Sequence, residues 1–449
     1  MGFNINKAAV LGAGVMGSAI AAHIAGAGIP VCLLDVVPKE LTEKEKAKGL
    51  TLDSPVVRNR IAQAGKDIVT NPKSRVIYDI EMGNMIEVGN FSDNMDMLKD
   101  CDWIIEAIVE DLETKKGFMK EVNKYRKPGT IISTNTSGIS IDKIAEDMSL
   151  EFRQNFLGTH FFNPPRYMKL LEIIPGKDTL QELVEFICYF GTMRLGKGIV
   201  MAKDTPGFVA NRIGSYALAT ALKLTERYGY DLAKVDQLTG PIIGRPPSAT
   251  FRTLDMVGID VFAHVVNNTK SLVDDVDEIE ALTVPQFVQK LIDNGQLGDK
   301  TKQGFYKKVV NPQKGKQTLM WDFKKDEYVE IPNEKVQAVE EARKADNPLE
   351  TLVYGEAEEN KFVWEIIKGT LIYSANNVPG IAEDFKEIDN GMVWGYNWAK
   401  GPFELWDAIG FEKSVKKMES EGEKIPEWIK ERLAQGKANF YEATSAEAP

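Results

Sequence analysis

The sequence predicts an α/β domain built on a mostly parallel sheet, followed by an all-α carboxyl-terminal region made of two related helical domains. Three observations predict this fold class. Eight short apolar runs typical of buried strands are spread over residues 1–202, with helical patterns between them. Helical apolar spacing then dominates the rest of the chain. Finally, two segments of that later part, residues 236–255 and 389–407, share one pattern, which indicates an internal repeat.

The bulk properties exclude several classes of protein. A chain of 449 residues is too long for one core and predicts two or three domains. Its net charge of −11 argues against general nucleic-acid binding, and no apolar run reaches the roughly 18 residues of a membrane span. Cys32, Cys101 and Cys188 are too scattered for a disulfide framework or a thiolate metal site. With no signal region at the amino terminus, we expect a cytoplasmic protein without a metal or a membrane partner.

A glycine loop follows the first predicted strand and opens a small, apolar helix. Gly12, Gly14 and Gly17 form a GxGxxG pattern, which lets the backbone approach a pyrophosphate at a helix amino end. The next strand ends in Asp35, 18 residues after Gly17, an acid that can accept from both ribose hydroxyls and repel a 2′-phosphate. The sequence therefore predicts a Rossmann-type domain that binds NAD in preference to NADP. His23, in the helix after the loop, is expected to be structural.

An insertion at about residues 39–80 separates the second and third predicted strands. A serine–proline helix start and apolar residues at helical spacing from Val57 to Ile68 predict a helical hairpin. Residues 39–75 contain nine Lys or Arg and five acids, although the chain as a whole is acidic. Such a basic segment would attract a polyanionic substrate. The alternative is a solvated charged face with no binding role.

Polar residues also follow two later strands. The strand at residues 102–109 ends at Glu110, and Lys115 lies on the following helix. Because the cofactor lies at the carboxyl ends of the strands in such sheets, both residues could line the nicotinamide side. The next strand leads into a hydroxyl-rich segment with Thr136, Ser137 and Ser140. Hydroxyls there are either helix caps or active-site donors.

His160 ends the sixth predicted strand, directly before a rigid turn with two prolines. Glu172 follows 12 residues later inside an apolar run, where an ionised carboxylate is costly to bury without a partner. We expect His160 to be that partner. A carboxylate that accepts from one imidazole nitrogen fixes the tautomer and makes the other nitrogen a better proton acceptor. The alternative is an ordinary core histidine at a strand end.

In combination and in this order, the motifs resemble the 3-hydroxyacyl-CoA dehydrogenase family over about the first 310 residues. The resemblance implies that His160 is the catalytic base, that Glu172 orients it, and that Ser137 and Asn211 bind the reacting oxygen. The motifs that carry it are the glycine loop with Asp35, Glu110 with Lys115, NTS at 135–137, HFFNP at 160–164 with Glu172, DTPGFVANR at 204–212, GRPPSATFRTLDMVGID at 244–260 and LGDKTKQGFY at 297–306.

The resemblance also implies the reaction and the ligands. It implies NAD as the cofactor and an acyl-CoA thioester as the substrate. The implied reaction is oxidation of (S)-3-hydroxyacyl-CoA to 3-oxoacyl-CoA in fatty-acid β-oxidation. The insertion is then assigned to the CoA portion, with Lys66 as a loosely matched contact. Two alternatives stay open, namely a dehydrogenase of another 3-hydroxy acid, such as a sugar acid or a short-chain acid, and a dinucleotide-binding subunit without activity. The basic insertion argues against the first, and the complete set of four site residues argues against the second.

The repeat defines the expected domains of the carboxyl-terminal region. We expect a first helical domain at 203–308, a linker at 309–335 that contains a short hairpin, and a second, degenerate copy at 336–449. The second copy has Val363, Trp364 and Glu365 where the first has Asn211, so it should be structural. Single-copy members of the family dimerise through this domain, whereas fused members carry a tandem pair. We therefore expect a monomer with an internal pseudo-dimer, an apolar patch exposed by a cut after Lys308, and room for association with other β-oxidation enzymes.

Overall fold

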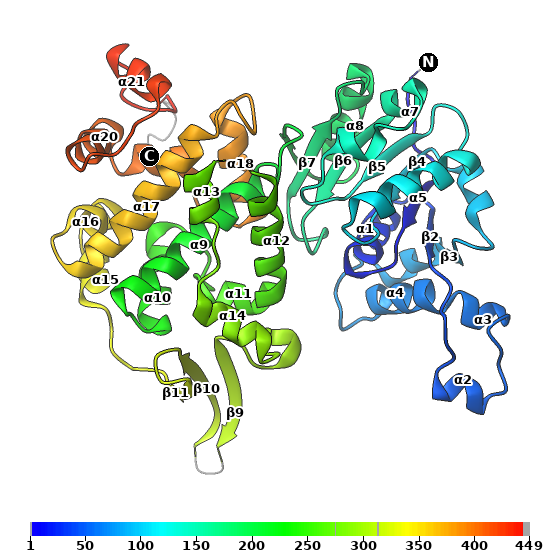
Figure 1. The fold of residues 1–449 in the computed structure, drawn as a ribbon, viewed down its shortest axis with the longest axis horizontal. Helices are drawn as coiled ribbons and strands as arrows, with labels where there is room; N and C mark the ends of the chain where they lie inside the picture. The colour runs from blue at the N-terminus through cyan, green and yellow to red at the C-terminus, as the bar shows by residue number, and fades with distance from the viewer. Residues whose placement is uncertain (1, 274, 312–313, 443–449) are drawn as a thin grey trace. The chain divides into compact units, whose positions relative to one another are not determined.

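The computed structural model describes residues 2–273, 275–311 and 314–442 (Figure 1). The chain forms two compact units, residues 1–208 and 209–449. The division falls directly after Pro206 and Gly207, the pair of turn-forming residues that follows the last strand of the first unit. It therefore lies six residues beyond the expected boundary at 202.

The first unit is built on an eight-stranded sheet with the order β3-β2-β1-β4-β5-β6-β7-β8. All neighbouring strands are parallel except β6 and β7, which are antiparallel. The strands are β1 (Ala8–Leu11), β2 (Val31–Asp35), β3 (Ile86–Asn90), β4 (Trp103–Glu106), β5 (Ile131–Thr134), β6 (Phe156–Phe161), β7 (Leu170–Pro175) and β8 (Gly198–Met201). Each of the eight predicted strands is present, which confirms the predicted α/β class.

Helices cover both faces of this sheet, because consecutive strand residues point to opposite sides. Val10 packs in a core with Ile24 of α1, while Leu11 packs in a second core with Val122 of α5. The helical elements outside the insertion are α1 (Val15–Gly26), η1 (Ile80–Met85), η2 (Met95–Asp100), α5 (Leu112–Tyr125), α6 (Ile141–Ala145), α7 (Leu150–Gln154) and α8 (Gln181–Met193). The unit is therefore a doubly wound sheet, and the mutually parallel strands β1 to β6 all end at one rim.

The insertion forms three helical segments instead of the expected hairpin, α2 (Glu43–Ala47), α3 (Pro55–Arg58) and α4 (Arg60–Thr70). Asn59 separates α3 from α4 and shifts the helical phase. Val57 is buried as expected, but Ile68 is 65% exposed, because α4 turns Ala62, Gly65 and Val69 towards the protein. A Cβ atom at Gly65 would collide with Ser18 of α1, so this glycine allows the two helices to approach closely.

The second unit is mainly helical. Its first half contains α9 (Ala210–Tyr228), α10 (Leu232–Thr239), η3 (Pro241–Ile243), α11 (Phe251–Val257), α12 (Ile259–Leu272), α13 (Val276–Ala281), α14 (Gln286–Asp293) and η4 (Asp299–Thr301). Its second half contains α15 (Gln337–Ala342), α16 (Pro348–Tyr354), α17 (Glu358–Asn376), α18 (Phe385–Gly395), α19 (Pro402–Ala408), α20 (Phe411–Ser420) and α21 (Glu427–Ala434). Among the described residues, no helix has both the length and the apolar character needed to cross a membrane.

Corresponding hydrogen bonds occur in the two halves of the second unit. Asp236 accepts from the N–H at the start of α11 (2.8 Å) and from the Tyr306 hydroxyl (2.7 Å). Asp389 accepts from an N–H near the start of α19 (2.8 Å) and from the Tyr441 hydroxyl (2.7 Å). These contacts support the proposed division into two copies of one helical unit.

The second aspartate of each pattern also plays the same part in both halves. Asp255 accepts from the backbone N–H groups of residues 305 and 306, and Asp407 accepts from those of residues 440 and 441. Gly258 and Gly410 directly precede α12 and α20, with φ values of 104° and 86°. Because positive φ favours glycine, similar turns occur at corresponding places in the two halves.

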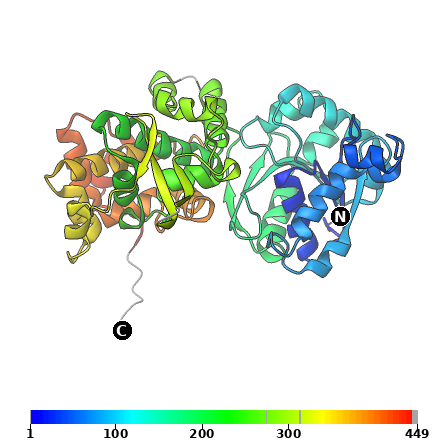
Figure 2. The same ribbon diagram turned by 90° about the horizontal axis from the view of Figure 1, so that it is seen from below.

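Residues 306–330 form a three-stranded antiparallel sheet, β9 (Tyr306–Asn311), β10 (Gly315–Asp322) and β11 (Glu327–Glu330). The expected hairpin corresponds to β10 and β11, and β9 adds a third strand. Figure 2 shows this sheet beside the helices of residues 209–308. Met320 and Trp321 of β10 are each 2% exposed, and the Trp321 ring lies 6.4 Å from that of Phe287 in α14. The segment is thus packed against the first helical half.

Candidate active site

The glycine loop has the shape that a bound dinucleotide requires. Gly12 has φ +106°, and a Cβ atom there would collide with the carbonyl oxygen of Ala107. A Cβ atom at Gly17 would collide with the carbonyl of Gly12, so the helix lies tightly against the loop. At Gly14, by contrast, no described atom would lie within 4 Å of a Cβ atom. The loop therefore leaves open space at the amino end of α1, where backbone N–H groups favour a phosphate.

Asp35 ends β2 beside this loop. Its Oδ2 accepts from the backbone N–H of Ala13 at 2.5 Å, and its Oδ1 accepts from the N–H of Val36 at 2.6 Å. The carboxylate thus holds the glycine loop to the end of the neighbouring strand. This is the rim position that the sequence predicted for an acid that binds ribose.

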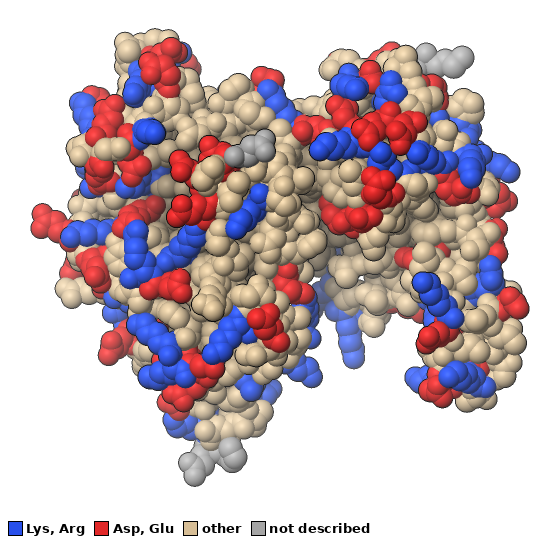
Figure 3. All heavy atoms as spheres, in the orientation of Figure 1, with Lys and Arg blue, Asp and Glu red and all other residues tan. Residues whose placement is uncertain are grey.

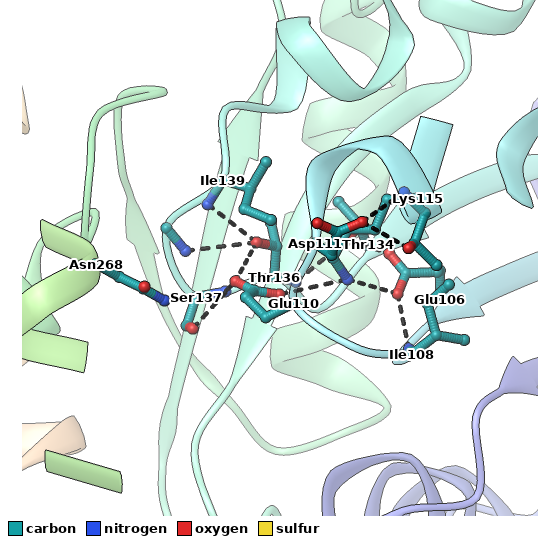
Figure 4. A network of polar contacts seen from close by, with 12 residues as sticks. Glu106, Ile108, Glu110, Asp111, Lys115, Thr134, Thr136, Ser137, Ile139 and Asn268 are labelled. Carbon is teal, nitrogen blue, oxygen red and sulfur yellow. Dashed lines mark hydrogen bonds and ion pairs between the residues drawn. The ribbon is translucent and has the colours of Figure 1, made fainter. Parts of the chain in front are cut away.

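A buried ion-pair network lies at the ends of β4 and β5 (Figure 4). The Lys115 ammonium is 2.6 Å from Glu106 and 3.4 Å from Glu110. Lys115 is 1% exposed and Glu106 is fully buried, with its second oxygen accepting from the Thr134 hydroxyl at 2.6 Å. Sequence reasoning missed Glu106, because β4 was expected to continue to residue 109. The pattern that could have identified Glu106 is the one that identified Glu172, namely an acidic residue inside an apolar run.

Glu110 connects this network to the hydroxyl-rich segment. Its Oε1 accepts from the Thr136 hydroxyl (2.6 Å) and from the Ser137 N–H (2.8 Å) and hydroxyl (3.2 Å). Burial raises the pKa of Glu110, but the Lys115 charge and these donors outweigh burial, so that the pKa lies below its usual value. Glu110 is therefore an ionised acceptor that positions Ser137. Ser140, in contrast, caps α6 by accepting from the Lys143 N–H.

The structure brings His160 and Glu172 together as a cross-strand pair. They are opposite each other in the antiparallel register of β6 and β7, and His160 Nδ1 lies 2.6 Å from Glu172 Oε2. His160 is 5% exposed and Glu172 is fully buried. The rings of Phe162 and Phe208 lie 4.6 and 5.7 Å from the imidazole. The pair is thus held in an apolar setting, with Nδ1 engaged by Glu172.

Lys197, which sequence reasoning did not single out, fixes the turn that follows β6. Its buried ammonium donates to the carbonyl of Pro165 and, at 2.9 Å, to that of Met168. Burial lowers the pKa of Lys197 to about 8. On the same side, Asn135 accepts from the Phe161 N–H at 2.9 Å and ties the end of β5 to β6. These contacts hold the backbone that follows His160.

Of the other two histidines, one is half-buried and one is exposed. His23 Nε2 lies 3.0 Å from the Leu195 carbonyl, and burial together with the nearby Lys197 charge lowers the pKa of His23 to about 4. A neutral ring bonded to a backbone carbonyl agrees with the structural role that the sequence indicated. His264 lies on α12 of the second unit and bonds to Asn268 at 3.0 Å.

Asn211 is the second residue of α9 and belongs to the second unit, whereas the other three predicted catalytic residues belong to the first. Its Oδ1 accepts from the hydroxyl of Tyr396 at 3.3 Å. Tyr396 follows α18 in the second helical copy. No feature of the local sequence indicated this partner, which lies 185 residues further along the chain.

The insertion contains a pocket of about 270 Å³ between α2 and α4. On the face of the molecule drawn in Figure 3, basic and acidic side chains are interspersed. Several basic residues of the insertion have hydrogen-bond partners. Arg58 bonds to Asp93 at 2.7 Å, Arg60 bonds to Glu45, and Lys66 donates to the Ile86 carbonyl at 2.6 Å. The pocket is lined by Lys44, Glu45, Lys48, Leu50, Val56, Arg60, Gln63, Ala64 and Asp67. Lys66 therefore anchors α4 to β3, and its expected CoA contact stays a prediction.

Two family models match most of the chain. Residues 7–205 match "3-hydroxyacyl-CoA dehydrogenase, NAD binding domain", and residues 207–308 match "3-hydroxyacyl-CoA dehydrogenase, C-terminal domain". A "Probable 3-hydroxyacyl-CoA dehydrogenase" of Bacillus subtilis is 46% identical over 98% of this chain, but the matched part is only 55% of that protein. A protein of the same description from Deinococcus radiodurans is 44% identical over 68% of this chain and 83% of its own length.

A solved structure supports the fold of nearly the whole chain. The crystal structure of 3-hydroxybutyryl-CoA dehydrogenase from Escherichia coli superposes with a TM-score of 0.66 and covers 96% of this chain and 99% of its own. At 20% identity this likeness concerns the fold alone. The two family models and the Bacillus subtilis relative, which extend over both units, show that the chain belongs to the 3-hydroxyacyl-CoA dehydrogenase family.

Proposed function

We propose that this chain oxidises (S)-3-hydroxyacyl-CoA to 3-oxoacyl-CoA with NAD in fatty-acid β-oxidation, with His160 as the base and Glu172 as the residue that orients it. The buried cross-strand contact of 2.6 Å between these two side chains carries the proposal. It supports a catalytic role because a carboxylate fully removed from solvent interacts strongly with the positive charge that an imidazole gains on accepting a proton. Membership of the family supports the reaction class.

When bound, NAD would supply the hydride acceptor for the carbon that bears the hydroxyl group. His160 takes the hydroxyl proton at Nε2 as the hydride leaves, so that the alcohol becomes a carbonyl. Glu172, on Nδ1, keeps the ring in the tautomer with a free Nε2 lone pair and stabilises the imidazolium that forms. In the reverse direction, the imidazolium returns the proton to the carbonyl oxygen.

Ser137 and Asn211 are proposed to hydrogen-bond to the reacting oxygen and to stabilise its developing charge. The support for Ser137 is that its N–H donates to the ionised carboxylate of Glu110 at 2.8 Å, which fixes the residue at this rim. Its hydroxyl has one hydrogen, which it donates to Glu110 at 3.2 Å in this structure, and would turn from Glu110 to the reacting oxygen when substrate binds. Glu110 and Lys115 are proposed to lie towards the nicotinamide end, since they follow β4 at the rim that the glycine loop shares. Gly12, Gly14, Gly17 and Asp35 would hold the rest of the cofactor.

The insertion is proposed to receive the phosphate-bearing end of CoA. The pocket between α2 and α4 is lined by three basic residues, Lys44, Lys48 and Arg60, by two acids, Glu45 and Asp67, and by apolar residues such as Leu50 and Val56. Arg60 is paired with Glu45, so Lys44 and Lys48 are the proposed phosphate contacts. Cationic side chains beside an apolar wall suit a nucleotide that carries phosphates. The alternative of a solvated face would leave CoA affinity unchanged when these lysines are replaced.

Steady-state consumption of NADH with 3-oxoacyl-CoA substrates of several chain lengths tests the proposal. Turnover with at least one chain length, together with competitive inhibition by free CoA, is the expected result. A dehydrogenase of sugar acids or short hydroxy acids would turn over its substrate without competitive inhibition by free CoA. An inactive dinucleotide-binding subunit would bind NADH and turn over none of the substrates, and either outcome would refute the proposal.

The expected assembly and location belong to the same proposal. We propose a cytoplasmic monomer in which the two helical copies form a pseudo-dimer, with association to other β-oxidation enzymes through other surfaces. The contact between α9 and α17 supports the pseudo-dimer, because the rings of Tyr216 and Tyr373 stack 3.9 Å apart with an interplanar angle of 5°. In addition, Arg212 of α9 donates to the Tyr373 hydroxyl at 2.9 Å.

A further inference from the structure

Asn211 receives a hydrogen bond from the second helical copy. The Tyr396 hydroxyl donates to Asn211 Oδ1 at 3.3 Å, across 185 residues of sequence. Asn211 is the second residue of α9, and its side chain is half-buried, as is that of Tyr396. Under the proposed function, on which this inference rests, the Asn211 amide binds the reacting oxygen. A group that bonds to one end of that amide decides where its other end points.

The ring of Tyr396 packs directly on α9 at a position where only glycine leaves enough room. Gly214 lies three residues after Asn211, on the same side of the helix. A Cβ atom at Gly214 would collide with the phenol ring, and it would lie 2.6 Å from the hydroxyl oxygen. Glycine inside a helix is destabilising, so its presence here has a specific reason. The reason is the close approach of Tyr396 to the helix that carries Asn211.

Hydrogen bonds within α18 and a contact with the first helical copy fix the backbone around Tyr396. Its own N–H closes the end of α18 by donating to the carbonyl of residue 392 at 3.0 Å. Three residues later, the N–H of Ala399 donates to the Gly244 carbonyl at 2.7 Å, and the Arg245 guanidinium lies 4.9 Å from the centre of the Trp398 ring. The phenol is therefore positioned by fixed backbone on both sides of the contact.

The chemistry of the amide gives this contact a direction. A side-chain amide has one oxygen that accepts and one nitrogen that donates two hydrogens. A carbonyl or alkoxide oxygen needs a donor, so it must meet the amide nitrogen. With the Tyr396 hydroxyl donating to Oδ1, the amide cannot turn its oxygen towards the substrate without losing that bond. We propose that Tyr396 is a positioning residue, which acts through Asn211 and presents the Nδ2 donors to the reacting oxygen.

The proposal assigns a role to a helical copy that has no residue equivalent to Asn211. Beyond covering an apolar face, this copy supplies the phenol that orients an active-site amide of the first copy. The hydroxyl should thus matter for turnover and hardly at all for cofactor affinity, because the glycine loop and Asp35 belong to the first unit.

Tyr396→Phe keeps the ring on Gly214 and removes only the hydroxyl. Loss of one neutral hydrogen bond predicts a fall in kcat of about three- to tenfold with 3-oxoacyl-CoA, while the KM for NADH and the thermal unfolding temperature stay unchanged. Tyr354→Phe is the matched control, since its hydroxyl donates to the Ile409 carbonyl at 2.9 Å within the second copy. This control should leave kcat within about twofold of the wild type.

The same substitution in an Asn211→Ala background separates positioning from a general structural effect. If Tyr396 acts through Asn211, the second substitution adds less than about 1.5-fold to the loss caused by the first. An equal fold-loss in both backgrounds, or an unchanged kcat in Tyr396→Phe, overturns the inference while the proposed function stands. If Asn211→Ala keeps full activity, the role of Asn211 and this inference both fall. If the wild type turns over no 3-oxoacyl-CoA, the proposed function falls with them.

Discussion

Replacing Glu172 by glutamine tests the catalytic pair with little change in shape. The 2.6 Å contact joins a fully buried carboxylate to an imidazole that must become positive during the reaction. A hydrogen bond to a charged group contributes about 1.5–3 kcal/mol. The glutamine oxygen can still accept from Nδ1, so packing and tautomer survive, but the charge that stabilises the imidazolium is lost. At about 1.4 kcal/mol per tenfold, we expect kcat to fall about 10- to 150-fold.

The assay is the steady-state consumption of NADH with a 3-oxoacyl-CoA, combined with a direct measurement of NADH binding. The dissociation constant for NADH should stay within about twofold of the wild type, because the loss of proton transfer is a transition-state effect. His160→Ala should lower kcat further, by about 10²- to 10⁴-fold, since the general base itself is removed.

The double variant provides the decisive comparison. Once His160 is absent, Glu172 has no imidazolium to stabilise, so the combined loss should be much smaller than the product of the two separate losses. A Glu172→Gln enzyme with more than half of the wild-type kcat would refute the reasoning. So would a double variant whose losses multiply, because the two side chains would then act independently.

Three further predictions concern the cofactor, the substrate and the assembly. Asp35→Ser should lower the preference for NADH over NADPH, measured as the ratio of kcat/KM values, by about tenfold, because an acceptor for the ribose and a repulsive charge are both lost; an unchanged ratio would mean that another acid selects the cofactor. Replacing Lys44 and Lys48 by Glu should raise the KM for the acyl-CoA about three- to tenfold at low salt and leave the KM for the matching pantetheine thioester unchanged. An equal rise in the KM of both substrates would exclude a phosphate contact. A chain cut after Glu334 should expose the face of α9 that contacts α17 and should associate, as measured by light scattering. A chain cut after Lys308 should also expose the core beneath β10. A soluble, active monomer from either truncation would contradict the pseudo-dimer.

The cross-strand pair could be predicted because two separate patterns converged on it. His160 stands at a strand end, and Glu172 interrupts an apolar run 12 residues later, with a turn between them. Two strands joined by a turn have few ways to pair, so the partner of a buried acid could be inferred from spacing. Glu106 carries the same signal, and it was missed because an apolar run of eight residues was interpreted as one continuous strand.

The insertion shows where periodicity fails. The apolar spacing from Val57 to Ile68 predicted one stripe, but the single non-helical residue Asn59 changes the phase between α3 and α4. Which face of α4 is buried then depends on the contact of this helix with α1, where Gly65 permits close approach. A break of one residue is nearly invisible in a sequence, yet it rotates every later side chain of a helix to another side.

By itself, the sequence determined the features that depend on neighbouring residues. These are the strand, glycine loop and helix that form a dinucleotide site, the acid at the end of β2 and the eight strands of the sheet. Their signals lie within a few turns or strands of one another, where local geometry allows few alternatives. Only the tertiary structure revealed the Lys115 network, the anchoring of the β6 turn by Lys197 and the contact of Tyr396 with Asn211. The Lys197 and Tyr396 contacts join residues that are 29 and 185 positions apart. The Lys115 contact spans only nine positions, but it depends on how α5 packs on the end of β4, which no local pattern specifies.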